Sequence, residues 1–337
     1  MATLDAAQIL SISQGHFAAG ALKAALEMEI FTHIAHGTAT PAQLAAAKKT
    51  PLRSMRLLCD ALVGLGLVEY DGDKLSLPEA AARMLVKGAP GYIGNQVGIS
   101  HAPWFWEGAQ NLVEIVKTGH PLLGPNSAEA RELPFWEQFQ RYSRQTAASG
   151  GAALAEAIAA VSGEPGPQRI LDIACGSGMY GFSLLKRFPQ AHLVLNDYAN
   201  VLRLTEADAE RIGLRERCEF RPGDLFSDDL GSSYDLVLAV NIFQIYGPAK
   251  IEQLARRLHQ AMALGGRLVV CGPIPDEERR ANRFALMFGM NMLIFTQEGD
   301  IYTFSEYQRM LTAAGFHDLT AHDVAGPRPI QAIIAHK

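Results

Sequence analysis

Three glycines and three aspartates give the clearest chemical signal in this sequence. The glycines form a G-x-G-x-x-G pattern within residues 171–181, between a predicted strand and a predicted helix. Asp172, Asp197 and Asp224 lie at or just after the ends of successive predicted strands. The glycine pattern alone would also fit a dinucleotide site. Asp172, however, stands four residues before the first glycine, where its charge would oppose a pyrophosphate.

The spacing of these acids fits a positively charged nucleoside better. Asp197 lies 25 residues after Asp172, where a carboxylate can accept hydrogen bonds from both hydroxyls of a ribose. Asp224 could accept a hydrogen bond from an adenine amino group, and the helix N-terminus after Gly178 could receive a carboxylate. S-adenosylmethionine, with its sulfonium and ammonium, therefore fits better than NAD. The alternative for any single aspartate is that it only caps the following helix.

The elements that must position these residues alternate between strands and helices from Gln168 onward. Such alternation predicts a parallel sheet with helices on both faces, here closed by an antiparallel hairpin. A last helix is expected to begin with Ser305 as its cap and to end at Ala314. The expected strands cover residues 169–173, 192–196, 218–221, 234–240, 266–271, 317–324 and 331–335.

Residues 1–90 predict a separate domain of short helices. Strands at 67–70 and 74–77 add a hairpin, which gives the element order of a winged helix. The domain holds eight basic and eight acidic side chains, so it lacks the basic face that a DNA reader needs. We therefore expect it to mediate dimerisation. One of its helices carries an apolar stripe of Phe17, Leu22, Leu26 and Ile30.

Residues 91–160 predict helices with many aromatic side chains, including all three tryptophans of the chain. These rings either fill the core between domains or form the wall of a pocket for a flat organic molecule. The aromatic residues are Trp104, Phe105, Trp106, Phe135, Trp136, Phe139 and Tyr142.

The composition of the whole chain excludes several classes of protein. Its 337 residues exceed what one hydrophobic core usually serves, and 48% hydrophobic residues exclude intrinsic disorder. A formal charge of −5 disfavours binding to nucleic acid or an anionic membrane. The four cysteines form no C-x-x-C pair, which fits a reducing cytosol better than a disulfide framework or a zinc site. The sequence has no apolar run long enough to cross a bilayer and no basic N-terminal start, so we expect a cytoplasmic protein. We also expect that it binds no metal.

These motifs resemble those of the class I S-adenosylmethionine-dependent methyltransferases. The resemblance rests on the glycine motif, on Asn-Asp-Tyr-Ala-Asn-Val around Asp197 and on Gly-Asp-Leu-Phe around Asp224. Together with the winged helix, the chain is similar over nearly its whole length to the small-molecule O-methyltransferases of caffeate, polyketide and phenazine type. This implies a Rossmann-like α/β domain, a seven-stranded sheet with a terminal antiparallel hairpin, plus an N-terminal all-helical winged-helix dimerisation domain.

The resemblance also implies a domain organisation and a set of cofactor residues. Residues 1–90 would form the dimerisation domain, 91–160 a helical linker with the substrate pocket, and 161–337 the cofactor-binding catalytic domain. A homodimer and a role in secondary metabolism are implied as well. The residues expected to bind S-adenosylmethionine are Asp172, Gly176, Gly178, Asp197, Tyr198, Gly223, Asp224, Leu225 and Asn241.

One position departs from the family in a way that bears on the reaction. After the fourth strand the family usually has a histidine that removes the acceptor's proton, and Gln244 stands there in this sequence. The two glutamates that support the histidine in plant members correspond to Cys271 and Ile301. A phenol has a pKa of about 10 and usually needs a base, whereas a primary amide can only orient an acceptor by hydrogen bonds.

Three explanations stay open for this departure. The acceptor atom is nitrogen or carbon, or its hydroxyl is already ionised, or another residue is the base. His101 is the candidate base, although it also fits a hydrogen-bonded interface histidine, and Tyr246 and Tyr142 either orient the acceptor or simply pack. We expect methylation of a small aromatic or heteroaromatic metabolite, on oxygen by family resemblance, with nitrogen or carbon as alternatives. The rival is a non-methylating regulator or catalyst that retains the cofactor site.

Overall fold

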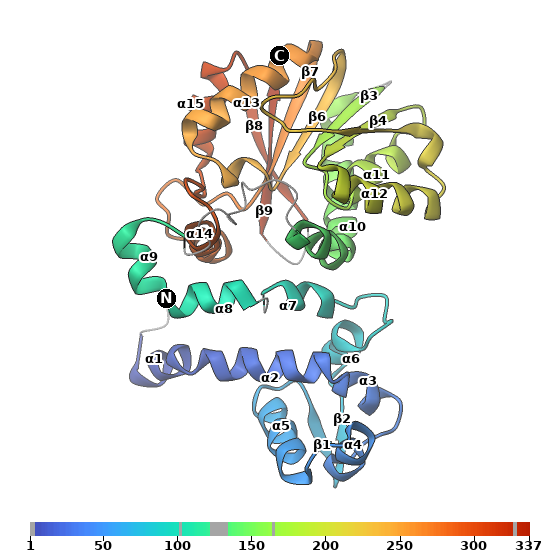
Figure 1. The fold of residues 1–337 in the computed structure, drawn as a ribbon, viewed down its shortest axis with the longest axis vertical. Coiled ribbons are helices and arrows are strands. Elements are labelled where there is room, and N and C mark those ends of the chain that lie inside the picture. The colour runs from blue at the N-terminus through green and yellow to red at the C-terminus, as the bar shows by residue number, and fades with distance from the viewer. Residues whose placement is uncertain (1–3, 101–102, 122–133, 164–165, 326–328) are drawn as a thin grey trace. The chain divides into compact units, whose positions relative to one another are not determined.

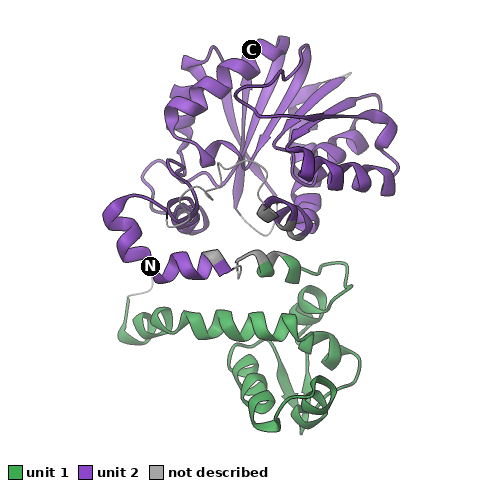
Figure 2. Cartoon of the chain, in the orientation of Figure 1, with its two compact units in different colours: residues 1–102 green, residues 103–337 purple. Residues whose placement is uncertain are grey.

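The computed structural model describes residues 4–100, 103–121, 134–163, 166–325 and 329–337. The chain divides into two compact units, Met1–Ala102 and Pro103–Lys337 (Figure 2). The boundary falls inside the segment 91–160. The first helix of that segment therefore belongs to the first unit, and its later helices belong to the second.

The first unit combines helices with a two-stranded hairpin. Its elements are α1 (Ala6–Ser13), α2 (Gly15–Glu27), α3 (Ile30–Ala35), α4 (Pro41–Lys48), α5 (Leu52–Gly64), β1 (Glu69–Asp71), β2 (Lys74–Ser76), α6 (Glu79–Leu85) and α7 (Gly94–Ser100). Helix α4 begins at a capping box, in which Thr40 accepts the N–H of Gln43 and the Gln43 side chain accepts the N–H of Thr40. The hairpin turns at Gly72, whose φ of +64° favours glycine. The hairpin expected from the sequence is therefore present.

The first unit has its own apolar core. Residues from α3, α4, α5, β2 and α6 fill it, among them Phe31, Leu44, Met55, Leu62 and Leu75. The apolar stripe expected on one helix is divided between α2 and α3, because the chain turns at Glu29, whose φ is +53°, and it enters this core only in part. Ile30 is buried, whereas Phe17 is 70% exposed.

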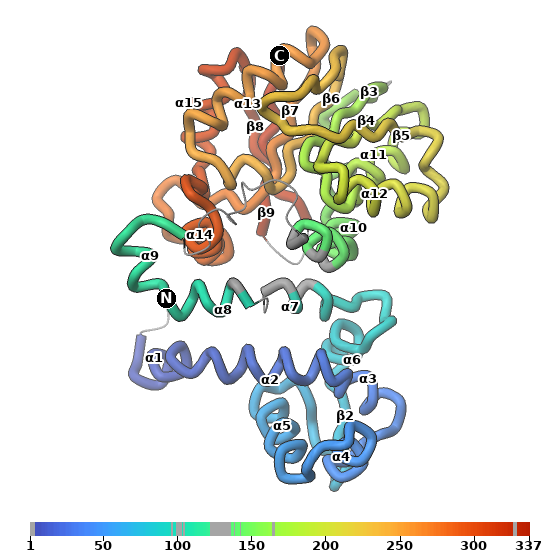
Figure 3. Tube along the Cα trace, viewed as in Figure 1, coloured from blue at the N-terminus to red at the C-terminus, as the bar shows by residue number. Residues whose placement is uncertain are grey.

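The second unit is built on a seven-stranded sheet with the order β5-β4-β3-β6-β7-β9-β8 (Figures 1 and 3). The first five strands in this order are parallel, and β9 pairs antiparallel with both β7 and β8. The parallel sheet and its terminal hairpin are thus as expected. The strands are β3 (Arg169–Ile173), β4 (His192–Asp197), β5 (Cys218–Pro222), β6 (Tyr234–Val240), β7 (Met262–Gly272), β8 (His317–Val324) and β9 (Ile330–His336).

Helices cover both faces of this sheet (Figure 1). On one face lie α10 (Pro134–Ser162), α11 (Met179–Arg187) and α12 (Ala199–Arg211), and on the other lie α13 (Pro248–Ala261) and α15 (Phe304–Ala313). Successive strand residues face opposite cores, as Ile170 and Leu171 do. The other α-helices that the structure describes in this unit are α8 (Pro103–Gln110), α9 (Leu112–Thr118) and α14 (Arg283–Phe295), and the 3-10 helices η2 (Arg215–Arg217) and η3 (Phe243–Ile245) add one turn each. In the part of the chain that the structure describes, no helix is both long enough and apolar enough to cross a bilayer.

The start of α15 differs from the expectation. Thr303, not Ser305, is its N-cap: the Thr303 hydroxyl accepts the N–H of Glu306 at 3.3 Å, and the Glu306 carboxylate accepts the N–H of Thr303 at 2.8 Å. The acidic residue three positions on completes a capping box at Thr303, which is why the helix begins there.

Strand order reverses around β3, which lies between β4 and β6. In an open α/β sheet, ligands bind outside the carboxyl ends of the strands at such a switch point. The loops that follow β3, β4 and β6 therefore define the place where a functional site is expected.

Candidate functional site

The loop after β3 has an unusual backbone conformation. Ala174, Gly176 and Gly178 have positive φ angles of 46°, 52° and 68°, and α11 begins directly after Gly178. A Cβ atom on Gly178 would lie 2.8 Å from the Thr205 methyl group, so only glycine fits there. A Cβ atom on Gly176 would meet no protein atom within 4 Å. The Gly176 position therefore leaves open space beside the backbone.

Asp172, at the end of β3, is buried and contacts the start of α11. It is 2% exposed, and its Oδ2 accepts the N–H of Gly181 in the first turn of α11 at 3.2 Å. Burial raises the pKa of Asp172 well above its ordinary value, and the nearby Asp197 adds to this effect. Asp172 therefore accepts a backbone N–H in the first turn of α11, as an aspartate that caps the following helix would.

Asp197 joins the end of β4 to the glycine loop. Its Oδ2 accepts the N–H of Gly176 at 2.8 Å, and its Oδ1 accepts the N–H of Tyr198 at 2.7 Å. Burial raises its pKa to about 6, although both hydrogen bonds act to lower it. Each carboxylate oxygen has a second lone pair, so Asp197 has the capacity to accept further hydrogen bonds.

The segment after β5 is tied to the end of β4. The N–H of Gly223 donates to the backbone oxygen of Asp197 at 3.1 Å, and the Asn196 amide donates to the Arg221 oxygen at 3.0 Å. Asp224 Oδ1 accepts the N–H groups of Phe226 at 2.9 Å and Ser227 at 3.1 Å. This oxygen of Asp224 therefore shapes the turn after β5, and it caps no helix, because the next described element of regular structure is β6.

Leu225 follows Asp224 and is buried among the side chains of the α13 and α15 face. The structure thus brings the expected cofactor residues after β3, β4 and β5 to one edge of the sheet. The hydrogen bonds of Asp197 connect the loop after β3 with the end of β4, and Gly223 connects the segment after β5 to that same strand end.

A pair of side-chain amides follows β6. Gln244 is 4% exposed, and its Nε2 donates to Oδ1 of Asn241 at 3.4 Å. Asn241 has a φ of +53°, and its N–H donates to the oxygen of Cys271 at 2.8 Å, which fixes it beside the end of β7. A Cβ on Gly272 would lie 3.5 Å from Gln244 Oε1. We call Gln244 and Asn241 the amide pair.

The two positions aligned with family glutamates are buried and carry no carboxylate. Burial raises the pKa of the Cys271 thiol to about 12, which keeps it neutral. Ile301 is also buried. Asp300, next to it, contacts Gln244 through its backbone N–H, and its carboxylate accepts the N–H of Ile301 at 2.7 Å.

An aromatic cluster within the second unit brings three helices together. Phe295 at the end of α14 lies 6.0 Å from the ring of Phe105 on α8 and 6.1 Å from that of Trp136 on α10. Trp136 also meets Phe139 edge to face at 5.9 Å. We call these four residues the Phe295 cluster.

Comparison with known proteins identifies the family of this chain. Residues 129–317 match the model of the O-methyltransferase domain, and residues 10–87 match that of the O-methyltransferase dimerisation domain. The chain belongs to the O-methyltransferase family. The predicted S-adenosylmethionine-dependent methyltransferase is thereby confirmed, and the non-methylating alternative finds no support.

Several relatives cover almost all of this methyltransferase. It is 27% identical to the tetracenomycin polyketide synthesis 8-O-methyl transferase TcmO of Streptomyces glaucescens, over 95% of this chain and 94% of that protein. It is 25% identical to the N,N-dimethyltransferase OxyT of Streptomyces rimosus, over 93% of this chain and 91% of that protein. A solved structure of an assigned O-methyltransferase from Nostoc punctiforme matches with a TM-score of 0.93 and 29% identity, covering 99% of this chain and 100% of that one.

The residues after β3 and β4 fit S-adenosylmethionine. Open space beside Gly176 leaves room for a ligand against the loop, and Asp197 has acceptor capacity for hydroxyl groups. The N-terminus of α11 favours a carboxylate.

The predicted catalytic residues of the methyltransferase are only partly placed. Tyr246 packs edge to face on Phe226 at 5.0 Å, and its backbone oxygen accepts the hydroxyl of Tyr302 at 2.9 Å. His101 lies outside the described residues. Tyr142 belongs to α10, but its side chain lies outside what the structure describes.

Sequence reasoning missed Thr205 of α12, which contacts the glycine loop. Its hydroxyl donates to the Gly176 oxygen at 2.5 Å. A threonine in an amphipathic helix carries no sequence signal for this contact, because the partner lies 29 positions away in the chain.

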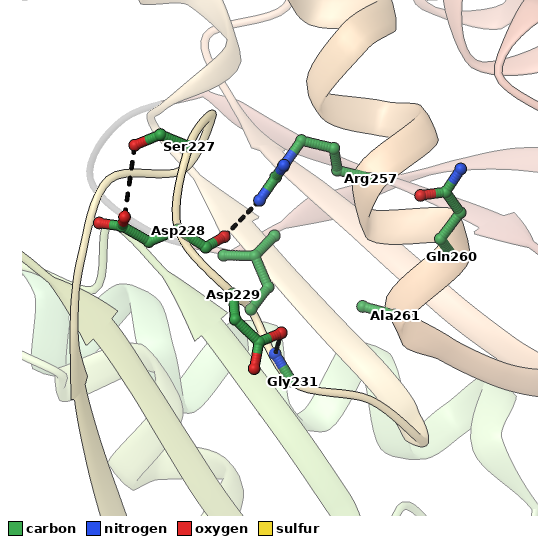
Figure 4. A pocket seen from close by; sticks show the side chains of 8 residues that line it. Ser227, Asp228, Asp229, Gly231, Arg257, Gln260 and Ala261 are labelled. Carbon is green, nitrogen blue, oxygen red and sulfur yellow. Dashed lines mark hydrogen bonds between the residues drawn. The ribbon is translucent and has the colours of Figure 1, made fainter.

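A separate cavity of 410 Å³ lies between the turn after β5 and α13 (Figure 4). Arg257 crosses it to donate to the backbone oxygen of Asp228. None of the predicted site residues lines it, so it is distinct from the loop at Gly176. Its lining consists of Ser227, Asp228, Asp229, Leu230, Gly231, Arg257, Gln260 and Ala261.

Proposed function

We propose that this enzyme methylates a small planar aromatic or heteroaromatic metabolite at an atom that needs no protein base. The observation that carries the proposal is Gln244, a buried neutral amide after β6. Its neighbours in the amide pair and at the end of β7, Asn241 and Gly272, cannot accept a proton at neutral pH either. The acceptor therefore reaches the site ready to attack.

S-adenosylmethionine supplies an electrophilic methyl group when it is bound. Gly176 leaves room for the ligand beside the loop, Gly178 allows the left-handed backbone turn before α11, and Asp197 accepts the ribose hydroxyls. Gly223, Asp224 and Leu225 flank the adenine. The set also includes Asp172, which fixes the first turn of α11, Tyr198, whose N–H orients Asp197, and Asn241 after β6.

The acceptor binds against aromatic rings. The Phe295 cluster supplies flat apolar surfaces from three helices, which suit a planar molecule. We assign this role to residues 91–160 together with α14, the cofactor to residues 161–337, and dimerisation to residues 1–90 as a winged helix. Tyr142 and Tyr246 stay predictions as orienting groups, and His101 stays the predicted substitute base, which an acceptor that needs no base would not require.

The reaction is a direct displacement, so the protein's main task is to hold the acceptor atom in line with the methyl group. The amide pair can do this, because Gln244 offers both a carbonyl acceptor and N–H donors. Oxygen is the acceptor atom that the family favours, and it must be ionised on binding. An aromatic amine is the second candidate, since Gln244 Oε1 can accept its N–H and a neutral amine attacks without prior deprotonation.

A labelled methyl donor tests the proposal. The enzyme is incubated with S-adenosylmethionine carrying a deuterated methyl group and three acceptor sets: acidic phenols, ordinary phenols and aromatic amines. Mass spectrometry should show methylation of the first or third set, with a rate that follows the acceptor's own pKa. Rapid methylation of ordinary phenols well below their pKa would show that a protein base exists.

We also propose that the enzyme is a homodimer joined through its first unit. The dimerisation domain covers residues 10–87, and α1 and α2 expose the large apolar side chains Ile9, Leu10, Ile12 and Phe17. Such a patch on a folded unit marks an interaction surface. All four cysteines are free thiols, which supports a reducing, cytoplasmic setting, and the relatives support a role in secondary metabolism.

A further inference from the structure

Thr205 is buried in the second turn of α12 and does not act as an ordinary core residue. Its Oγ1 lies 2.5 Å from the Gly176 oxygen and 3.1 Å from the Val201 oxygen of its own helix. A threonine hydroxyl has one hydrogen to donate, and the loop oxygen is the nearer acceptor. The hydroxyl therefore donates its hydrogen to the glycine loop rather than to its own helix.

The peptide groups on both sides of Gly176 are held by the same stretch of chain. Asp197, at the end of β4, accepts the Gly176 N–H, and Thr205, in the helix that follows β4, donates to the Gly176 oxygen. In a trans peptide the carbonyl and the following N–H point in opposite directions. Holding the Gly176 oxygen against α12 therefore turns the N–H of Ser177 away from α12.

The loop needs such restraint because of its backbone conformation. Ala174 has a φ of +46°, which is unfavourable for a residue with a Cβ atom and persists only where neighbours enforce it. Gly176 and Gly178 can adopt many conformations in a free chain. The Thr205 methyl group also fills the space beside Gly178, where a Cβ would lie 2.8 Å from it.

We propose that Thr205 is a positioning residue for cofactor binding: its hydroxyl fixes the Gly176–Ser177 peptide in the orientation that S-adenosylmethionine requires. This inference rests on the proposed cofactor site. Thr205 acts through its hydrogen bond to Gly176, and the role does not require that the side chain touch the cofactor. Loss of the hydroxyl leaves the Gly176 oxygen without this donor and lets the Gly176–Ser177 peptide rotate. Cofactor binding must then fix the peptide, and this weakens the affinity for the cofactor.

The test compares two substitutions that divide the side chain. Thr205→Val keeps the shape and the methyl group but removes the hydroxyl, whereas Thr205→Ser keeps the hydroxyl and removes the methyl group. Titration calorimetry with S-adenosylhomocysteine should show an affinity about tenfold weaker for Thr205→Val and within about threefold of the unsubstituted enzyme for Thr205→Ser. Thermal unfolding without ligand should show the reverse order, because the lost methyl group leaves a cavity beside Gly178.

Thr118, an exposed residue at the end of α9, provides a control for the loss of a threonine hydroxyl away from the glycine loop. Its hydroxyl donates to the oxygen of Glu114, four residues earlier. Thr118→Val should leave the affinity unchanged. If Thr205→Val and the unsubstituted enzyme bind with equal affinity, the role of Thr205 is refuted and the cofactor site is not. An equal loss of affinity in both Thr205 variants would refute the role of the hydroxyl in the same way. Absence of binding by the unsubstituted enzyme would overturn the cofactor site itself and this inference with it.

Discussion

The Asp197 carboxylate holds the backbone of Gly176 through a hydrogen bond of 2.8 Å. One residue thus orients the glycine loop and presents an acceptor at the end of β4. A substitution at Asp197 consequently affects both the shape of the loop and the contacts available to the nucleoside.

Replacing Asp197 with alanine should abolish most cofactor binding. The change removes the hydrogen bonds from Gly176 and Tyr198 and the acceptor proposed for the ribose. We expect the affinity for S-adenosylhomocysteine to fall about a hundredfold or more in calorimetry, since bonds to a charged group contribute about 1.5–3 kcal/mol each. Asp229→Ala, an exposed carboxylate in the loop before β6, is the control and should bind normally. Retained affinity in Asp197→Ala would remove Asp197 from the site.

Cofactor affinity should decrease as the pH falls through about 6. Burial raises the pKa of Asp197 to about 6, and the ionised carboxylate is the better acceptor for hydroxyl groups. Below that pH the affinity for S-adenosylhomocysteine should approach a tenfold loss per pH unit. Calorimetry between about pH 5 and about pH 8 measures this, and an unchanged affinity across the range would contradict the assignment.

The same pKa has the opposite consequence for the stability of the unliganded protein. The folded-state pKa lies above the ordinary value of 3.8, so the folded protein binds this proton more tightly than the unfolded chain does. Ionisation of Asp197 therefore lowers the free energy of unfolding as the pH rises from about 4 to about 6. Asp172, whose pKa burial also raises, acts in the same direction. Asp197→Ala should weaken this part of the pH dependence in urea unfolding curves.

Gln244→His should distinguish the acceptor atoms. A histidine at this position could remove a proton, so it should accelerate transfer to a hydroxyl at pH values below the acceptor's pKa. Above that pKa, or with an amine acceptor, the rate should change less than about threefold, because no proton needs to be removed first. The measurement is kcat against pH for each acceptor. A large gain at every pH with an ionised phenol would mean that Gln244 limits the rate in another way.

Charge on the exposed face of the first unit should disrupt the dimer. Phe17→Asp places a carboxylate in the apolar patch of α1 and α2, where association would bury it unpaired. Gel filtration at micromolar concentration should show a dimer for the unsubstituted enzyme and a monomer for the variant. Leu264→Asp, at a side chain of β7 that is 93% exposed, is the control and should remain dimeric. A monomeric unsubstituted enzyme would refute the proposed dimer.

Periodicity and local motifs in the sequence were sufficient to predict the main elements. The glycine pattern between β3 and α11, the alternation of strands and helices and the terminal hairpin are all patterns of residues close in the chain, and the structure contains the elements that they predict. Helix α15 begins after Thr303 rather than at the expected cap Ser305, because Glu306 completes a capping box with Thr303. The Gln244 departure could also be found by alignment of a short segment after β6.

Tertiary structure decided how those residues are used. The sequence could not show that Asp172 faces Gly181 inside the protein, that Thr205 reaches Gly176, or that Phe17 stays exposed. An aspartate at a strand end and a threonine on a helix have the same local pattern whether they face a ligand or the backbone. Only the packing of α11 and α12 against the sheet determines which polar groups come within hydrogen-bond distance, and hydrogen bonds depend on that distance and direction.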